Sequence, residues 1–197
     1  SIFAAGNRCI MKPSEYTPHC THLIKKLVEQ YFDVTELAVV IGGAKTGEIF
    51  STMPFDHLLF TGSTSIAPHV IRGSAENIIP LTLELGGKSP VIISQSANMK
   101  QTADRIMFAK TLNAGQICLA PDYIMLPENQ KETFLDLAID SIRTMFPKIK
   151  DNQDYTSIIN ERHYDRLNGY LADAKKKGAE IIEINPANEN FSQQEHF

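Results

Sequence analysis

The sequence has no tryptophan and only three cysteines, Cys9, Cys20 and Cys118. A small secreted domain built on disulfides needs more cysteines in an even number, so this odd and sparse set indicates free thiols. Free thiols are typical of a reducing compartment, and we expect a cytoplasmic protein. No pair of Cys or His residues has the close spacing of a zinc site, and no metal is predicted.

Long apolar runs and an excess of positive charge are missing as well. No run reaches the ~18 residues that a membrane-spanning helix requires, and no signal peptide is recognisable. The net charge of −4 disfavours a nucleic-acid partner, because phosphate binding needs clustered positive charge. With 43% hydrophobic and 21% charged residues, the composition is that of a soluble globular protein.

Both ends of the sequence have the character of cuts through a longer chain. Residues 1–6 are typical of the end of a helix followed by its terminating glycine, Gly6. Residues 185–197 are polar and stop without a closing element.

Strand and helix patterns alternate along the first part of the chain. Short apolar runs predict strands at 9–11, 37–41 and 57–60. Helical spacing of apolar residues predicts helices at 17–31, 47–53 and 65–75. This alternation is typical of an α/β fold, a parallel sheet with helices on its faces.

A second domain is expected to begin near residues 82–87. After this border, apolar runs predict strands at 91–93, 123–126 and 180–184. Amphipathic patterns predict helices at 99–112, 128–145 and 162–177, the last of them ended by Gly178.

Cys118 and Glu84 are the candidate catalytic residues. Cys118 follows a helix and a glycine turn, Gly115-Gln116-Ile117-Cys118, whose backbone N–H groups could stabilise an oxyanion. Most free cysteines are small buried hydrophobes, and that interpretation stays open for Cys118 alone. Glu84 lies between Leu83 and Leu85, where a charge is costly unless it faces a cavity; such a setting raises the pKa of a carboxylate and makes it usable as a base. The competing interpretation is an exposed carboxylate at the end of a strand.

Two other segments have features of a nucleotide site. The turn Thr61-Gly62-Ser63 joins a strand to a helix and could present N–H groups to a phosphate, although Ser63 could simply cap the helix. Lys12-Pro13-Ser14-Glu15 ends a strand and could bind a ribose, or could form an ordinary surface ion pair.

The four segments occur in an order that resembles the aldehyde dehydrogenase superfamily over essentially the whole chain. Cys118-Leu119-Ala120-Pro121 and 158–163 are similar to its class 3 branch, and 55–63 is similar to coniferyl aldehyde dehydrogenases. The resemblance implies an incomplete aldehyde dehydrogenase fold. Residues 1–84 would be part of a Rossmann-like NAD(P)-binding domain, and residues 85–197 part of the catalytic domain.

The resemblance also implies a mechanism and a cofactor. The Cys118 thiolate would attack an aldehyde, an aromatic one like coniferyl aldehyde, and Glu84 would activate the water that hydrolyses the resulting thioester. The cofactor would be NAD, with NADP possible, because a carboxylate at Glu15 repels a 2′-phosphate. Its expected contacts are Lys12, Ser14, Glu15, Gly62, Ser63 and the backbone of Leu85 and Gly86. The whole enzyme would be a homodimer.

The sequence departs from the family in two ways. Ala67-Pro68 stands where many relatives have glycine, and because proline is tolerated only in the first helical turn, Ser63 to Pro68 must be turn or first turn. The family's oxyanion-binding asparagine and its Glu-x-Phe segment are expected outside residues 1–197. Losing an oxyanion donor costs ~10²–10³ in rate, so the 197 residues alone are expected to be nearly inactive.

Three function classes follow from these observations. The first is an aldehyde oxidoreductase, and the second is a nucleotide-binding fragment that keeps the motifs without turnover. The third, an acyltransferase or thiol hydrolase, would need no nicotinamide and is disfavoured by the cofactor segments.

Overall fold

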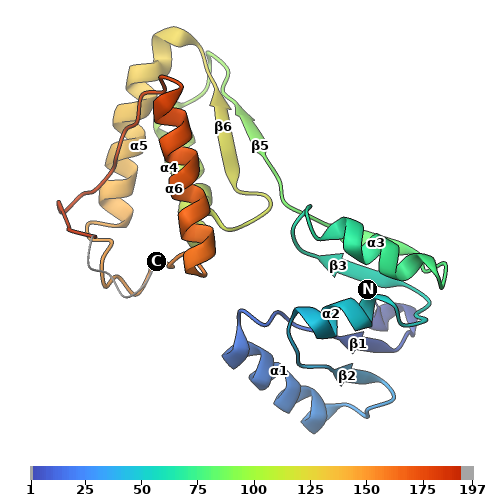
Figure 1. The fold of residues 1–197 in the computed structure, drawn as a ribbon. Helices are drawn as coiled ribbons and strands as arrows, with labels where there is room; N and C mark the ends of the chain where they lie inside the picture. Colours follow the sequence, from blue (N-terminus) through green and yellow to red (C-terminus); the bar gives the residue numbers. More distant parts are fainter. Residues whose placement is uncertain (1, 192–197) are drawn as a thin grey trace. The chain divides into compact units, whose positions relative to one another are not determined.

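The computed structural model describes residues 2–191. The chain divides into two compact units, Ser1–Leu85 and Gly86–Phe197. Each unit combines parallel strand pairs with helices (Figure 1). The predicted α/β class and the parallel direction of the strands are therefore confirmed, but the described strands form three separate two-stranded pairs and not one continuous sheet.

Between residues 2 and 85 the first unit forms four strands and three α-helices. The strands are β1 (Cys9–Met11), β2 (Leu37–Val39), β3 (Leu58–Thr61) and β4 (Leu81–Glu84). The helices are α1 (Pro18–Tyr31), α2 (Ala44–Ser51) and α3 (Ala67–Ala75), with the short 3₁₀ turn η1 (Phe3–Ala5) before them. Strand β1 pairs with β2, and β3 pairs with β4.

Each strand pair of the first unit has its own small core. Val28 of α1 packs on Leu37 and Val39 of β2, with Cys9 of β1 beside them. Under α3 the core consists of Leu58, Val70 and Ile79, with Phe50, Phe55, Phe60 and Leu81 around them. Helices α2 and α3 pack closely, since a Cβ on Gly73 would lie 2.4 Å from Ser51 Oγ.

Three helix starts differ from those expected by two residues or more. The helix expected at 128–145 begins at Lys131, because Glu128–Gln130 form a 3₁₀ turn. Helix α2 begins at Ala44 and not at residue 47, because Gly43 is extended (φ −85°, ψ −157°) and the helix follows it directly. Helix α3 begins at Ala67, two residues later than expected, with Pro68 in its first turn as the proline requires.

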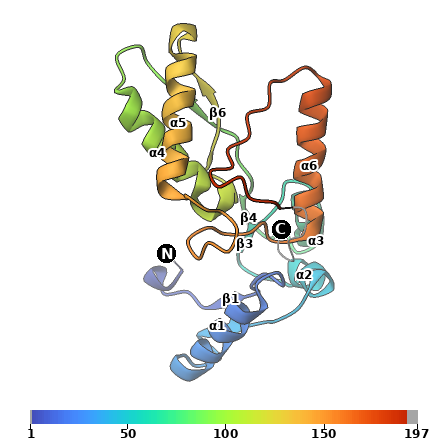
Figure 2. The ribbon, with the colours of Figure 1, turned by 90° about the vertical axis from the view of Figure 1, so that its left-hand side faces the viewer.

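The described residues of the second unit, 86–191, form one parallel strand pair and three α-helices. The strands are β5 (Ser89–Ile92) and β6 (Pro121–Met125). The helices are α4 (Met99–Thr111), α5 (Lys131–Met145) and α6 (Glu161–Lys176), with the 3₁₀ turns η2 (Leu112–Gly115) and η3 (Glu128–Gln130). Helices α4 and α5 pack side by side (Figure 2).

The core of the second unit lies between α4, α5 and the adjoining strands. Its buried residues are Ile93, Ala103, Ile106, Phe134 and Ala138. Strand alternation gives the β5–β6 pair one face toward this core and leaves Ile92, at 75% exposure, on the other.

Helix α6 is closed at Gly178 as the sequence predicts, and it begins at Glu161, one residue earlier than expected. The Asn160 side chain accepts a hydrogen bond from His163 N at 3.0 Å and caps the first turn. Gly178 adopts φ +85°, and Ala179 N donates to Ala174 O at 3.0 Å, which closes the helix in the manner of a Schellman motif.

The strand expected at 180–184 is absent from the part of the chain that the structure describes. Residues 178–185 have no ladder partner there, and Ile181 and Ile182 are exposed at 47% and 43%. An apolar run becomes a strand only when a neighbour satisfies its backbone N–H and C=O groups, which sequence pattern alone does not supply.

Candidate functional site

Cys118 lies in the turn between η2 and β6, and its side chain is exposed. The interpretation of Cys118 as a buried packing residue is therefore wrong. Access is one of the requirements for a nucleophilic thiol, and Cys118 meets it. Of the other two cysteines, Cys9 packs against the core beside β1 and β2, whereas Cys20 of α1 is exposed.

The chain turns sharply just before Cys118. Asn113, Ala114 and Gly115 have φ values of 52°, 53° and 75°, three successive residues in the left-handed region. For a residue with a Cβ this conformation costs roughly 1–2 kcal/mol. Strain of this kind persists where the surrounding structure fixes it and is concentrated at functional sites. Here it ends the helical stretch and brings the thiol to the surface.

Gly87 approaches the backbone of Cys118 more closely than any other residue type could. A Cβ on Gly87 would lie 2.1 Å from the Cys118 carbonyl oxygen and 3.2 Å from its carbonyl carbon. The second glycine of Leu85-Gly86-Gly87 is thus required by contact with the thiol-bearing residue. Beyond this contact, Lys88 Nζ and Asp122 Oδ1, 2.8 Å apart, join the same segment to the start of β6.

Substitution of Gly87 by alanine is expected to displace residues 113–118, the thiol loop, which carries Cys118. The new Cβ must move about 1 Å or more from the Cys118 carbonyl, and a shift of that size can cost ~10²-fold in rate when it misplaces a reacting group. Overpacking of this kind destabilises a fold by about 1–3 kcal/mol. Thermal unfolding of Gly87→Ala measures the loss of stability, and turnover with the aldehydes that the family resemblance predicts measures the loss of rate.

Gly169→Ala is the matched control for Gly87→Ala. Gly169 lies inside α6 with open space around its Cβ position, so alanine should be neutral or stabilise the helix by about 0.5–1 kcal/mol. Equal melting temperatures and rates for the two variants would contradict the role given to Gly87.

Glu84 is the last residue of β4, in the first unit. Strand alternation places it with Thr82 on the exposed side, opposite the half-buried Leu81 and Leu83. The expected enclosure of its carboxylate between Leu83 and Leu85 is therefore wrong. Those leucines are sequence neighbours, but in a strand successive side chains point to opposite faces.

The turn after β3 lies beside Glu84. Thr61 is in register with Glu84, and Gly62 N donates to the Glu84 carbonyl at 3.0 Å. Parallel pairing thus brings Gly62, Ser63, Glu84 and Leu85 to the same strand ends, the edge at which open α/β sheets bind ligands.

Ser63 does not cap α3 with its side chain. The N-cap of that helix is Ile66, without a side-chain hydrogen bond. The Ser63 hydroxyl lies 2.9 Å from that of Ser65 and is exposed. The Ser63 carbonyl accepts from Ile66 N and Ala67 N at 3.0 and 3.2 Å, so the turn is held by its backbone.

Lys12 and Glu15 form an ion pair at the end of β1. Lys12 Nζ lies 3.1 Å from Glu15 Oε2, with side chains 13% and 37% exposed. The pKa of Glu15 is lowered first by a hydrogen bond from its own backbone N–H and then by Lys12. Ser14 is held nearby, since its hydroxyl accepts from Tyr16 N at 3.2 Å.

Gly47 of α2 is a neighbour of this pair that sequence reasoning missed. A Cβ on Gly47 would lie 3.7 Å from Lys12 Cε, so the first turns of α2 flank the lysine stem. The strand–glycine–helix pattern at 37–47 could have indicated this neighbour. Because the parallel strands β1 and β2 end at the same edge, the helix after β2 starts near Lys12 at the end of β1.

Leu85 and Gly86 stand at the end of the first unit and the beginning of the second. Leu85 is half-buried, and Gly86 is exposed with no atom within 4 Å of its Cβ position. Open space at Gly86 leaves its backbone accessible to a ligand.

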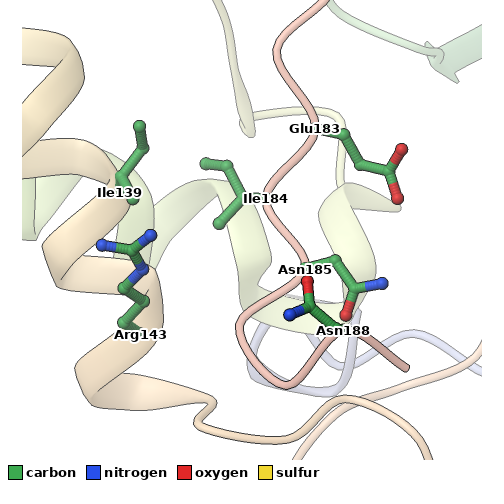
Figure 3. A pocket seen from close by; sticks show the side chains of 6 residues that line it. All are labelled: Ile139, Arg143, Glu183, Ile184, Asn185 and Asn188. Carbon is green, nitrogen blue, oxygen red and sulfur yellow. The ribbon is translucent and has the colours of Figure 1, made fainter.

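A hollow of about 380 Å³ in the second unit contains none of these residues. It lies between α5 and the segment 183–188, and Figure 3 shows its lining: Ile139, Arg143, Glu183, Ile184, Asn185 and Asn188. Residues 2–191 contain no helix long and apolar enough to cross a membrane. The same described residues hold no cluster of three His, Cys, Asp or Glu side chains placed for a metal ion.

Fold and motifs together define an α/β protein. It has an exposed thiol, and the turn after β3 lies beside the end of β4, at the kind of strand edge where open α/β sheets bind ligands. The aldehyde dehydrogenase family model matches residues 1–195, and the chain belongs to this family. It is 55% identical over 195 residues to the probable coniferyl aldehyde dehydrogenase of Caulobacter vibrioides, covering 99% of the chain and 40% of that relative. It is 56% identical over 190 residues to the coniferyl aldehyde dehydrogenase of a Pseudomonas species, covering 96% and 40%.

A solved structure agrees with the fold. Indole-3-acetaldehyde dehydrogenase in complex with NAD+ superimposes with a TM-score of 0.84 at 26% identity, covering 92% of this chain and 38% of that one. The chain thus spans about 40% of the length of the relatives it matches.

Proposed function

We propose that the protein carrying this chain oxidises an aldehyde to its carboxylic acid with NAD(P)+, through a thioester on Cys118. The observation that carries the proposal is an accessible thiol whose backbone is touched by Gly87, in a chain of the aldehyde dehydrogenase family. In this proposal residues 1–84 contribute to cofactor binding and residues 85–197 to the catalytic domain.

The covalent chain supports the pairing of Glu84 with Cys118. Gly87, which contacts the Cys118 carbonyl, is only three residues after Glu84. Three Cα–Cα steps of a trans chain span at most about 11 Å, so the Cα of Glu84 lies within that distance of the Cα of Gly87. The exposure of Glu84 suits a base that must meet a water molecule.

The proposed reaction has two halves. The Cys118 thiolate forms a C–S bond to the aldehyde carbon, and the carbonyl electrons move to its oxygen. A bound NAD(P)+ would supply the acceptor for the hydride that this carbon loses, and Cys118 would then carry the thioester. Glu84 takes a proton from water, hydroxide adds to the thioester, and the C–S bond breaks to release the acid and the thiolate.

The strand ends of the first unit suit the adenosine and phosphate parts of the cofactor. The Lys12–Glu15 pair offers a donor and an acceptor for ribose hydroxyls, with Ser14 and Gly47 beside it. Gly62 and Ser63 begin the turn before α3 and would bind the pyrophosphate, while the backbone of Leu85 and Gly86 would lie near the nicotinamide. The ionised Glu15 favours NAD over NADP, because it repels a 2′-phosphate.

Glu15→Gln is expected to weaken NAD binding about tenfold or more, since a charge-assisted hydrogen bond contributes roughly 1.5–3 kcal/mol. The ratio of NAD affinity to NADP affinity should fall as well. The pKa of Glu15 is lowered below the ordinary value of 4.5, so its carboxylate is still largely ionised when the pH has fallen to 4.5. Its contribution to NAD binding is therefore lost only at lower pH. Calorimetric titration with NAD and NADP between neutral pH and pH 4.5 measures both effects.

Glu29→Gln is the matched control, since Glu29 also pairs with a lysine, Lys25, at helical spacing in α1. Unchanged cofactor affinity in Glu15→Gln, or an equal loss in both variants, would contradict the ribose role.

The substrate proposed is an aromatic aldehyde like coniferyl aldehyde, as the names of the two relatives indicate. NADH formation by the whole protein, with coniferyl aldehyde compared against short aliphatic aldehydes, tests this. Absence of cofactor-dependent turnover with every aldehyde would refute the proposed reaction. Thioester formation without nicotinamide would instead favour an acyltransferase. We further expect a homodimer in a reducing compartment, which suits the three free thiols.

A further inference from the structure

The side-chain amide of Gln116, two residues before Cys118, makes three hydrogen bonds. Its Nε2 donates to the carbonyls of Asn113 at 3.0 Å and of Ser157 at 3.1 Å. Its Oε1 accepts from Ile159 N at 3.0 Å. Both amide hydrogens and the amide oxygen are therefore engaged with backbone, although the residue lies at the surface.

These bonds fix the amide in one orientation. If the amide were flipped, its oxygen would face two carbonyls and its NH₂ group would face the Ile159 N–H. Glutamine is thus the one residue type of this length that satisfies both sides, since glutamate has no donor and methionine neither donates nor accepts strongly.

The amide joins two segments that are about forty residues apart in the chain. One is the thiol loop, where Asn113 begins the left-handed run and its Nδ2 donates back to the Gln116 carbonyl at 3.3 Å. The other is 157–159, directly before Asn160, the residue that caps α6. Gln116 therefore ties the strained turn to the start of a helix.

We propose that Gln116 is a positioning residue for the Cys118 nucleophile. It holds the loop in the conformation from which the thiolate attacks a bound aldehyde, and it touches neither substrate nor cofactor. A strained loop with an exposed thiol needs an external anchor, and the Ser157 and Ile159 backbone provides it. This inference rests on the proposed function.

Gln116→Met and Gln116→Glu in the whole protein test the proposal. A misplacement of about 1 Å can cost ~10²-fold in rate, so the burst of NADH that reports attack on the aldehyde should slow to that extent. Alkylation of Cys118 by iodoacetamide needs no docked substrate, so its rate and pH profile should change little in Gln116→Met. Cofactor affinity should be unchanged in both variants.

Gln101→Met and Gln101→Glu are the matched controls. Gln101 is exposed on α4, so the same two substitutions are made there away from the loop that carries Cys118. A burst as fast as that of the controls would overturn the proposal. So would a parallel fall in burst, alkylation and melting temperature, which would mean that Gln116 only maintains the fold. If the unsubstituted protein formed no NADH with any aldehyde, the proposed function itself would fail, and this inference with it.

Discussion

Replacement of Cys118 by serine is expected to lower aldehyde oxidation by about 10⁴-fold or more, the scale of losses seen when a covalent nucleophile is removed. A serine hydroxyl has a far higher pKa than a thiol, and no base that could activate it is hydrogen-bonded to residue 118 among the contacts of the described residues. Steady-state NADH formation measures the loss. Mass spectrometry after mixing with aldehyde and cofactor should show no acyl adduct on the variant.

Cys20→Ser is the control for this substitution. Cys20 is a second exposed thiol, on α1 in the first unit, and the proposed chemistry makes no use of it. Its loss should leave turnover unchanged. A Cys118→Ser protein that retained substantial activity, or an adduct found on Cys20, would end the assignment of the nucleophile.

Glu84→Gln is expected to separate the two halves of the reaction. General-base catalysis contributes typically 10²–10⁴-fold, so hydrolysis of the thioester should slow to that extent. The first turnover should still release NADH, because attack and hydride loss precede the step that needs the base. Rapid-mixing measurements should show a burst of NADH followed by a slow phase, with the acyl-enzyme accumulating on Cys118.

Glu76→Gln provides the comparison, since Glu76 is an exposed carboxylate at the end of α3 and has no part in the proposed chemistry. It should leave both phases unchanged. Loss of the burst together with the slow phase in Glu84→Gln would mean that Glu84 also activates the thiol. Unchanged steady-state rates would remove Glu84 from the mechanism.

Local patterns predicted the elements that local chemistry controls. The end of α6 follows from Gly178, because glycine can adopt the positive φ that closes a helix. Pro68 confines the start of α3 to its own first turn, because the proline ring fixes φ and removes a backbone donor. The parallel direction of the strand pairs follows from the alternation of strands and helices, which requires a crossover after each strand.

Features that depend on distant neighbours were not predictable in this way. The strand expected at 180–184 lacks a ladder partner among the described residues, and Gly47 meets Lys12 only because β1 and β2 are adjacent. The bonds of Gln116 to Ser157 and Ile159 cross about forty residues and leave no trace in local pattern. Glu84 was misjudged because sequence neighbours were taken for spatial ones.

The three left-handed residues before Cys118 limit which sequences this turn can accept. Asn and Gly enter that backbone region at little cost, and Ala at a moderate one, whereas Val, Ile and Thr are excluded by the crowding at their branched carbon. In a library of variants, positions 113–115 should therefore tolerate only a few residue types, even though these side chains need not touch substrate. The position of the thiol thus depends partly on backbone torsion angles, which a comparison of reactive side chains alone does not reveal.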